Sequence, residues 1–257
     1  MAPSQPPPKA LNDGPPFTLL TSTGRASYPS SSTHQCAYMA SIMGEFHNCI
    51  LRGLNSAYRH SFTTPPSRDA ADLLRYSLLV CSLISAHHDW EENSYFPALE
   101  ALAGQPGILD SNIVQHHEFE DGLAAFKAYC ETTTGNGFSG EEFRERMRAF
   151  APSLDKHLST EPETFYRLRE LDSEALLKVY QEQANIALAK GNVWLTMPLV
   201  LGCEDKTYDL EGRKQHAHAI PWFLPYLAHY IFSWRYARLW RFNPCDFWGN
   251  PVKVHGE

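Results

Sequence analysis

HHDWEENSYFP, residues 87–97, places two histidines, an aspartate and two glutamates on one expected helix. The residues just before it are almost entirely apolar (LLVCSLI, residues 78–84), so the same helix begins as a buried segment. An unpaired buried charge costs several kcal/mol, and a domain stabilised by only about 5–15 kcal/mol cannot hold several of them. These polar side chains must therefore become neutral, pair with one another or bind a cation.

Helical phase places this polar group on the buried face. Residues three and four apart share one face of a helix, and His87 and Glu91 continue the apolar stripe of Val80 and Ile84. Three other expected helices carry polar residues on their apolar stripes in the same way: His47 in the first, His116 and Glu120 in the third, and His157 and Glu161 in the fourth. Each of the four helices therefore directs at least one histidine into the core.

A shared metal cluster explains this pattern. Two donors at i and i+4 lie about 6 Å apart along a helix, so the pairs His87/Glu91 and His157/Glu161 can converge on one centre. Nitrogen and oxygen donors without cysteine favour iron or manganese over structural zinc, and two carboxylates able to bridge indicate two ions. The alternative is a metal-free core in which the histidines are hydrogen-bonded to the glutamates.

The rest of the chain predicts an all-α protein. Helices are expected at 35–60, 67–102, 110–132 and 139–158, with caps at Ser67 and Ser139, and the short loops between them favour an antiparallel four-helix bundle. A fifth helix is expected at 173–190. Pro152 and Pro162 predict kinks or ends in the fourth helix. The predicted organisation is a disordered Pro/Ser-rich leader (1–32), the bundle (33–170), and a helical and irregular, aromatic-rich C-terminal extension packed on it (171–257).

Composition excludes several classes of function. The chain has 257 residues, 43% of them hydrophobic, and a net charge of -7, and it has no basic cluster suited to nucleic acid. Six cysteines without a CxxC pair indicate a reducing compartment. Six prolines in the first seventeen residues do not form a secretory signal, so we expect a cytoplasmic protein.

The segment 219–234 (AIPWFLPYLAHYIFSW) is the one candidate for membrane contact. It is shorter than the roughly 20 apolar residues of a span and contains two prolines and a histidine. Its aromatic residues and the arginines that follow are also compatible with a weak contact of residues 219–241 with a membrane surface. The aromatic residues are alternatively a cap over a bundle edge or a roof over a substrate pocket.

Four motifs, in order, resemble the hemerythrin family and its hemerythrin-like HHE cation-binding domains. They are HNCILRGLNSAY (47–58), HHDWEENSYFP (87–97), QHHEFEDGL (115–123) and HLSTEPETF (157–165), and the ending RYARLWRFNPCDFWGNP (235–251) is similar to fungal members. The resemblance implies a four-helix bundle around a non-haem centre of two iron ions that binds dioxygen. The metal ligands that it implies are His47, His87, Glu91, His116, His157 and Glu161.

One position departs from the oxygen carriers of this family. They have a second histidine four residues after the first in the third helix, where this chain has Glu120. A carboxylate in place of an imidazole favours higher oxidation states of iron, so Glu120 is expected to tune or open the site toward oxygen activation. His88 and His117, next to expected ligands, are expected to point elsewhere, and Glu92 is expected to be solvated or to support a ligand.

Three hypotheses for function follow. The first is a di-iron oxidase or oxygenase acting on a small organic molecule, in secondary metabolism as one possible setting. The second is a non-catalytic oxygen- or iron-binding protein for storage, transport or sensing. The third is a metal-free scaffold with a membrane-surface tail, which metal analysis distinguishes from the other two.

Overall fold

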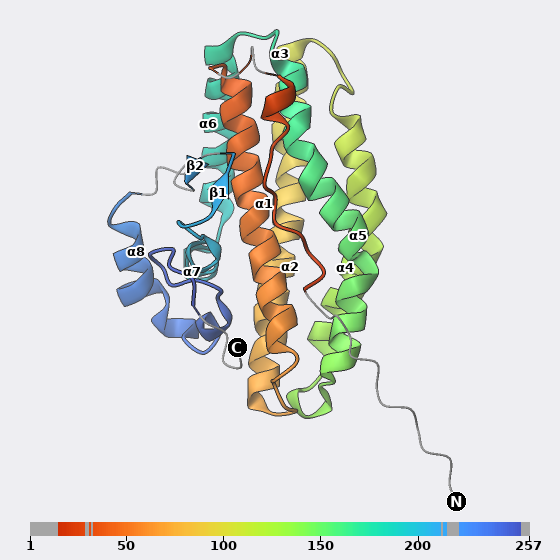
Figure 1. The fold of residues 1–257 in the computed structure, drawn as a ribbon, viewed down its shortest axis with the longest axis vertical. Helices are drawn as coiled ribbons and strands as arrows, with labels where there is room; N and C mark the ends of the chain where they lie inside the picture. The colour runs from red at the N-terminus through yellow and green to blue at the C-terminus, as the bar shows by residue number, and fades with distance from the viewer. Residues whose placement is uncertain (1–14, 29–30, 32, 212, 215–220, 253–257) are drawn as a thin grey trace, which may run out of the picture.

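The computed structural model describes residues 15–28, 31, 33–211, 213–214 and 221–252. Four long helices run along the longest axis of the molecule (Figure 1): α1 (Gln35–His60), α2 (Arg68–Trp90), α4 (Asp110–Thr132) and α5 (Gly140–Thr164). Each packs against two others, in the cyclic order α1, α2, α4, α5. The predicted antiparallel four-helix bundle is confirmed.

Side-chain caps begin three of these helices. The side chains of His34, Ser67 and Ser139 accept hydrogen bonds from backbone N–H groups in the first turns of α1, α2 and α5. The caps predicted at Ser67 and Ser139 are thus present. The short 3-10 turn η4 (Gly135–Gly137) lies in the connection between α4 and α5.

The expected helix at 67–102 is three consecutive helical segments. A π-helical turn, η3 (Glu91–Tyr95), follows α2 and is followed in turn by α3 (Phe96–Ala103). In the π turn the Phe96 N–H bonds to the Glu91 carbonyl, five residues earlier. Such a turn widens a helix locally and is common at functional sites.

The fourth helix of the bundle extends beyond its expected end. α5 continues through Pro152 and Pro162 to Thr164, and the 3-10 turn η5 (Phe165–Leu168) follows it. The predicted end of this helix near 158 is wrong, because neither proline ends it, whereas a kink at either proline stays a prediction. Packing on both neighbouring helices holds the helical path even though each proline lacks an N–H donor.

The polar residues of the bundle lie in a layer between two apolar clusters. Along α1, Met43 belongs to one cluster and Ile50 to the other, with His47 between them. Along α2 and η3, Ile84 and Tyr95 bracket the polar residues in the same way. The site is therefore enclosed from above and below by packed side chains.

Residues 15–28, which include the 3-10 turn η1 (Arg25–Ser27), pack along the bundle and bury Phe17 and Leu20. Asn55 bonds to both the backbone N–H and C=O of Phe17, at 3.3 and 2.9 Å, and Asn48 does the same for Leu20, at 2.7 and 3.0 Å. The expected disordered leader over 1–32 is therefore not what this stretch forms. Residues 1–14, 29–30 and 32 lie outside the described part.

The C-terminal extension packs beside α1 and α2 (Figure 1). It begins with α6 (Ser173–Lys190) and α7 (Val193–Cys203), followed by an antiparallel pair, β1 (Asp209–Leu210) and β2 (Arg213–Lys214). The rest is α8 (Leu224–Leu227), the π turn η6 (Ala228–Phe232), and the 3-10 turns η7 (Trp234–Tyr236) and η8 (Trp240–Phe242). The predicted fifth helix is α6, with the expected bounds.

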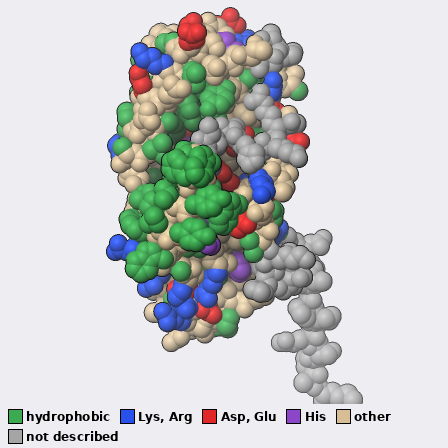
Figure 2. Space-filling view, turned by 90° about the vertical axis from the view of Figure 1, so that its left-hand side faces the viewer, with side chains coloured by type: hydrophobic (Ala, Val, Ile, Leu, Met, Phe, Trp, Pro, Cys, Tyr) green, Lys and Arg blue, Asp and Glu red, His purple; other side chains and the backbone are tan. Residues whose placement is uncertain are grey.

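Charged pairs fix the end of this extension to the beginning of α2. Arg238 Nε lies 2.6 Å from Asp72 Oδ2, and Arg241 lies 2.8 Å from Asp69 and 3.2 Å from Asp72. Figure 2 shows an apolar patch on the outer face of the extension. The exposed large apolar side chains of the extension include Trp222, Tyr226, Tyr230 and Trp234. No helix among the described residues is long and apolar enough to cross a membrane. All six cysteines are buried free thiols.

Candidate metal centre

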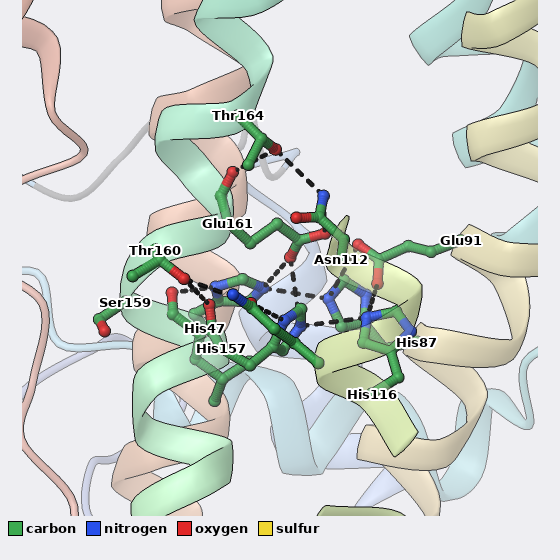
Figure 3. Close-up of polar contacts among 12 residues, drawn as sticks. His47, His87, Glu91, Asn112, His116, His157, Ser159, Thr160, Glu161 and Thr164 are labelled. Carbon is green, nitrogen blue, oxygen red and sulfur yellow. Dashed lines mark hydrogen bonds and ion pairs between the residues drawn. The ribbon is translucent and has the colours of Figure 1, made fainter. Parts of the chain in front are cut away.

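The structure brings together six side chains that the sequence indicated, as Figure 3 shows. They come from four helices and the π turn, and each is nearly or fully buried: His47 (α1), His87 (α2), Glu91 (η3), His116 (α4), and His157 and Glu161 (α5). Their Nε2 atoms face one another: His47 to His87 and His116 to His157, both at 3.2 Å. Carboxylate oxygens lie among these nitrogens, with Glu161 Oε2 3.1 Å from His47 Nε2 and Glu91 Oε1 3.3 Å from His87 Nε2.

Outer acceptors orient three of the imidazoles. Their Nδ1 atoms lie 2.7 Å from the Leu158 carbonyl oxygen (His47), 2.5 Å from Glu92 Oε1 (His116) and 3.2 Å from Gln115 Oε1 (His157). An Nδ1–H that donates outward leaves the Nε2 lone pair pointing into the cluster. This is the arrangement that metal-binding histidines require.

The acceptor for His47 exists because of a proline. In an α-helix the Leu158 carbonyl would accept the N–H of residue 162, but Pro162 has no N–H. The free carbonyl accepts the His47 Nδ1–H instead. Pro162 therefore does not break the helix, and it provides a buried acceptor at the site.

Glu92 supports a cluster residue. Its side chain is 25% exposed, and its carboxylate accepts from the fully buried His116 ring. Of the two alternatives that the sequence left open for Glu92, solvated or supporting a ligand, the structure has the second.

His88 is placed differently from the expectation. Its side chain is buried, and its ring centroid lies 4.3 Å from that of His116 and 5.1 Å from that of His157. With Glu91 these residues form a group whose potential donor atoms all lie within 4.8 Å of one another. The prediction that His88 points away from the cluster is therefore wrong.

A signal for His88 was present in the sequence. Adjacent residue pairs are buried at seven-residue intervals along α2: Leu73–Leu74, Val80–Cys81 and His87–His88. Seven residues are nearly two helical turns, so both columns of side chains face the bundle. The stripe traced through Val80, Ile84 and His87 alone described only one of these columns.

Glu120 lies outside the cluster. Its side chain is 51% exposed and pairs with the exposed His117, at 2.9 Å. The inward position on this part of α4 belongs to Phe119, which is buried and whose ring contacts those of His88 and His157. Burial of an aromatic ring is more favourable than burial of a carboxylate, so the helix presents Phe119 to the core. Of the two expected roles of Glu120, the geometry does not favour a ligand that tunes the iron, since Glu120 is in neither donor group. The alternative, in which Glu120 points away and leaves a position on the metal open, stays a prediction.

Burial dominates the electrostatics of the cluster. Desolvation lowers the pKa of His87, His88 and His157 well below the usual 6.5, so these rings are neutral. Desolvation and the nearby Glu161 carboxylate raise the pKa of Glu91 well above its usual 4.5. Two carboxyl groups and several neutral imidazoles thus share one buried volume.

Several donor atoms of the cluster have no hydrogen-bond partner. These are both carboxylate oxygens of Glu91, Oε2 of Glu161 and Nε2 of His88. The other Glu161 oxygen, Oε1, accepts from Asn112 Nδ2 at 3.4 Å. Unsatisfied buried polar atoms are costly, and lone pairs that converge on one volume are what a cation satisfies. The residues present therefore fit a metal centre.

The donors fall into two groups that share one carboxylate. One contains His88, Glu91, His116 and His157, and the other contains His47, His87, Glu91 and Glu161. Glu91 belongs to both because it lies between the two histidines of α2 around the helix axis, about 40° from His87 and about 60° from His88. Its two oxygens are directed accordingly, Oε1 toward His87 at 3.3 Å and Oε2 toward His116 at 3.7 Å.

Comparisons with known proteins agree with this geometry. Residues 39–168 match the model of the hemerythrin HHE cation-binding domain, the range that contains every member of the cluster. The chain is 34% identical over 247 residues, 96% of its length and 93% of the relative's, to the dimeric xanthone biosynthesis cluster protein R11 of Cryptosporiopsis sp. (strain 8999), so the similarity includes the C-terminal extension. No solved structure matches the chain. The chain belongs to the hemerythrin HHE cation-binding domain family.

Proposed function

We propose that this protein is a non-haem di-iron protein that activates dioxygen and oxidises a small organic molecule. The observation that carries the proposal is the pair of donor groups that share Glu91, because a carboxylate between two sets of donors is suited to bridging two ions. Nitrogen and oxygen donors without a cysteine in either group favour iron over a structural zinc.

When bound, two iron ions would supply the site at which dioxygen is reduced and the substrate is oxidised. The chain's own residues hold and shield that site. His47, His116 and His157 are held by outer acceptors, and the apolar clusters on both sides exclude water. A rigid, dry pocket around reactive iron limits side reactions, which an oxidising enzyme needs.

We place the approach to the site at His87, the most exposed member of the cluster at 8%. The Phe46 ring centroid lies 4.8 Å and the Trp90 centroid 6.2 Å from the His87 ring, and both aromatic residues are partly buried. Such a setting suits dioxygen and a flat, apolar substrate. The relative's name refers to biosynthesis of a dimeric xanthone, an aromatic compound, and we propose an aromatic molecule as the substrate here.

The exposed aromatic patch has no part in this proposal. Trp222 and Trp234 are 81% and 73% exposed, and the segment that follows them is anchored at Asp69 and Asp72, at the far end of α2 from His87. These contacts favour the extension as a cover over α1 and α2, and we do not propose the aromatic residues as a roof over a substrate pocket. A weak contact of 219–241 with a membrane surface and a cytoplasmic location stay predictions.

Anaerobic reconstitution with ferrous iron, followed by a pulse of dioxygen, tests the proposal. Activation predicts two irons per chain and an optical transient that decays to a ferric product. A stable band that disappears when oxygen is removed would instead identify a reversible oxygen-binding protein. Well under one iron per chain, with stability unchanged by chelator, would leave the metal-free scaffold as the correct description.

The substrate class needs a separate test. Single-turnover reactions of the diferrous protein with phenolic and with aliphatic candidates should yield oxidised product only from the aromatic set. Replacing Phe46 with alanine should weaken the apparent substrate affinity while the iron content stays the same, since Phe46 contacts His87 without being in either donor group. Equal turnover of both sets of compounds would contradict the aromatic assignment.

A further inference from the structure

We infer that His88 is a metal ligand and that it supplies the third imidazole of a nitrogen-rich site, in place of a donor from α4. The inference rests on the proposed function, because it requires that the cluster binds metal. It makes the two metal sites unequal: one would have three imidazoles and the shared Glu91, and the other two imidazoles, Glu91 and Glu161.

The position of His88 satisfies the geometric requirement for a ligand. A donor atom of its ring lies within 4.8 Å of donor atoms on Glu91, His116 and His157, which come from three different elements. Donors bound to one ion at about 2.0–2.2 Å lie no more than about 4.4 Å apart, so a group whose donor atoms spread over up to 4.8 Å must contract slightly to bind one. Rotation about the side-chain bonds supplies the small adjustment that remains.

The hydrogen-bonding state of His88 points to the same role. Its Nε2 atom is buried and has no hydrogen-bond partner, and the residue as a whole is only 5% exposed. A histidine with a purely structural role in a core forms hydrogen bonds, since an orphaned ring nitrogen costs about 1–3 kcal/mol. Phe119, on the adjoining helix, packs on the ring at 5.0 Å and offers no acceptor. A cation is the partner that this lone pair lacks.

The α4 side chain at the position expected to contribute to the site, Glu120, does not reach the cluster. Glu120 is exposed and paired with His117, so α4 contributes His116 alone among the donors. His88 fills the vacancy from the opposite side, because α2 packs directly against α4. A donor on α2 can replace a donor on α4 because α2 has two buried columns of side chains, one with His87 and the other with His88.

Replacement of His88 by leucine and by alanine, with His117→Ala as the matched control, tests the inference. His117 neighbours the cluster residue His116 just as His88 neighbours His87, but its side chain is 63% exposed. The probes are ferrous iron, added anaerobically and counted per chain, and Mössbauer spectroscopy of the diferrous protein. We expect two unequal iron signals in the wild type and in His117→Ala. In both His88 variants we expect one signal to be lost or shifted, with at least about 10-fold weaker binding at that site.

Metal-free stability separates a ligand from a structural residue. In chelator-treated protein, His88→Leu should unfold at the same or a higher urea concentration than the wild type, because it removes an orphaned polar atom. Added iron should stabilise the wild type more than the variant. Two irons bound to His88→Leu with wild-type affinity and an unchanged spectrum would overturn the inference alone. A wild type that binds no iron would overturn the proposed function as well.

Discussion

His47 Nδ1 lies 2.7 Å from the backbone carbonyl oxygen of Leu158, a contact that joins α1 to α5 at the centre of the bundle. The carbonyl is available because Pro162, four residues later, has no N–H to donate. A proline inside a helix, which alone is destabilising, thereby orients a cluster residue on another helix. The arrangement also fixes the tautomer of His47 so that Nε2 faces the site.

Replacing Pro162 with alanine restores an N–H that competes with His47 for the Leu158 carbonyl. We expect about 10-fold weaker iron binding, the size of effect typical of partners that orient a metal-binding histidine. Anaerobic titration with ferrous iron measures it. Pro152→Ala is the matched control, because Pro152 lies in the same helix but is exposed. Equal iron affinity in the two variants would show that the free carbonyl has no role in orienting His47.

The metal-free protein should lose stability as the pH falls from about 7.5 to about 5.5. The pKa values of His87, His88 and His157 lie well below 6.5 in the folded state, so the unfolded chain binds more protons in this range. Glu91, with a raised pKa, acts in the opposite direction above about pH 4.5, since there the folded state holds the extra proton. Three histidines outweigh one glutamate. The net loss approaches roughly 3 kcal/mol per pH unit when all four groups titrate fully.

Urea unfolding of chelator-treated protein at several pH values checks this sign. Iron binding should weaken over the same range, because protons compete with iron for the imidazoles and carboxylates. A metal-free stability that stays level or increases on acidification would contradict the neutral, buried state of these histidines.

Replacing Asp72 with alanine should loosen the C-terminal extension without removing iron. The Asp72 carboxylate is 6% exposed and lies 2.6 Å from Arg238 and 3.2 Å from Arg241, whose side chains are 44% and 38% exposed. Because the arginines are partly solvated, we expect a loss of about 1–2 kcal/mol in the free energy of unfolding, with faster proteolysis after α7. Glu118→Ala, which breaks an exposed pair with Lys156, should cost under about 0.5 kcal/mol. A fall in iron content in Asp72→Ala would contradict the separation of the extension from the site.

Replacing Gly122 with alanine should force α4 and α5 apart. The added Cβ would lie 2.7 Å from the Phe150 Cβ, closer than packed carbon atoms allow. We expect a loss of about 1–2 kcal/mol, after the small gain in helix propensity, and weaker iron binding, because the same two helices carry His116 and His157. Thermal unfolding with and without iron measures both effects.

Gly191→Ala is the control for Gly122→Ala. A Cβ at Gly191 meets nothing closer than 3.5 Å, and we expect a change within about 0.5 kcal/mol. Similar losses in the two variants would show that the close approach at Gly122 is not what sets the spacing of α4 and α5.

The sequence alone determined the architecture and most of the cluster. Hydrophobic periodicity and the caps at Ser67 and Ser139 define the bundle helices, because these signals depend only on residues near one another in the chain. Helical phase likewise placed His47 and His157 on buried faces. A polar residue in phase with an apolar stripe must face the core wherever the helix packs.

Only the tertiary structure decided that His88 lies in the cluster and Glu120 does not. It also decided that Pro162 leaves the Leu158 carbonyl free as an acceptor and does not end the helix. Each side chain lies within reach of the buried face in its own helix, so the outcome depended on which neighbour competed for that space. Phe119 takes the inward position on α4, whereas on α2 two adjacent columns of side chains are both buried. The partner of the Leu158 carbonyl likewise comes from α1, more than 100 residues away. The paired residues of α2 are a local pattern that indicates His88, but they do not exclude Glu120 on α4. Contacts between segments far apart in the chain set these choices.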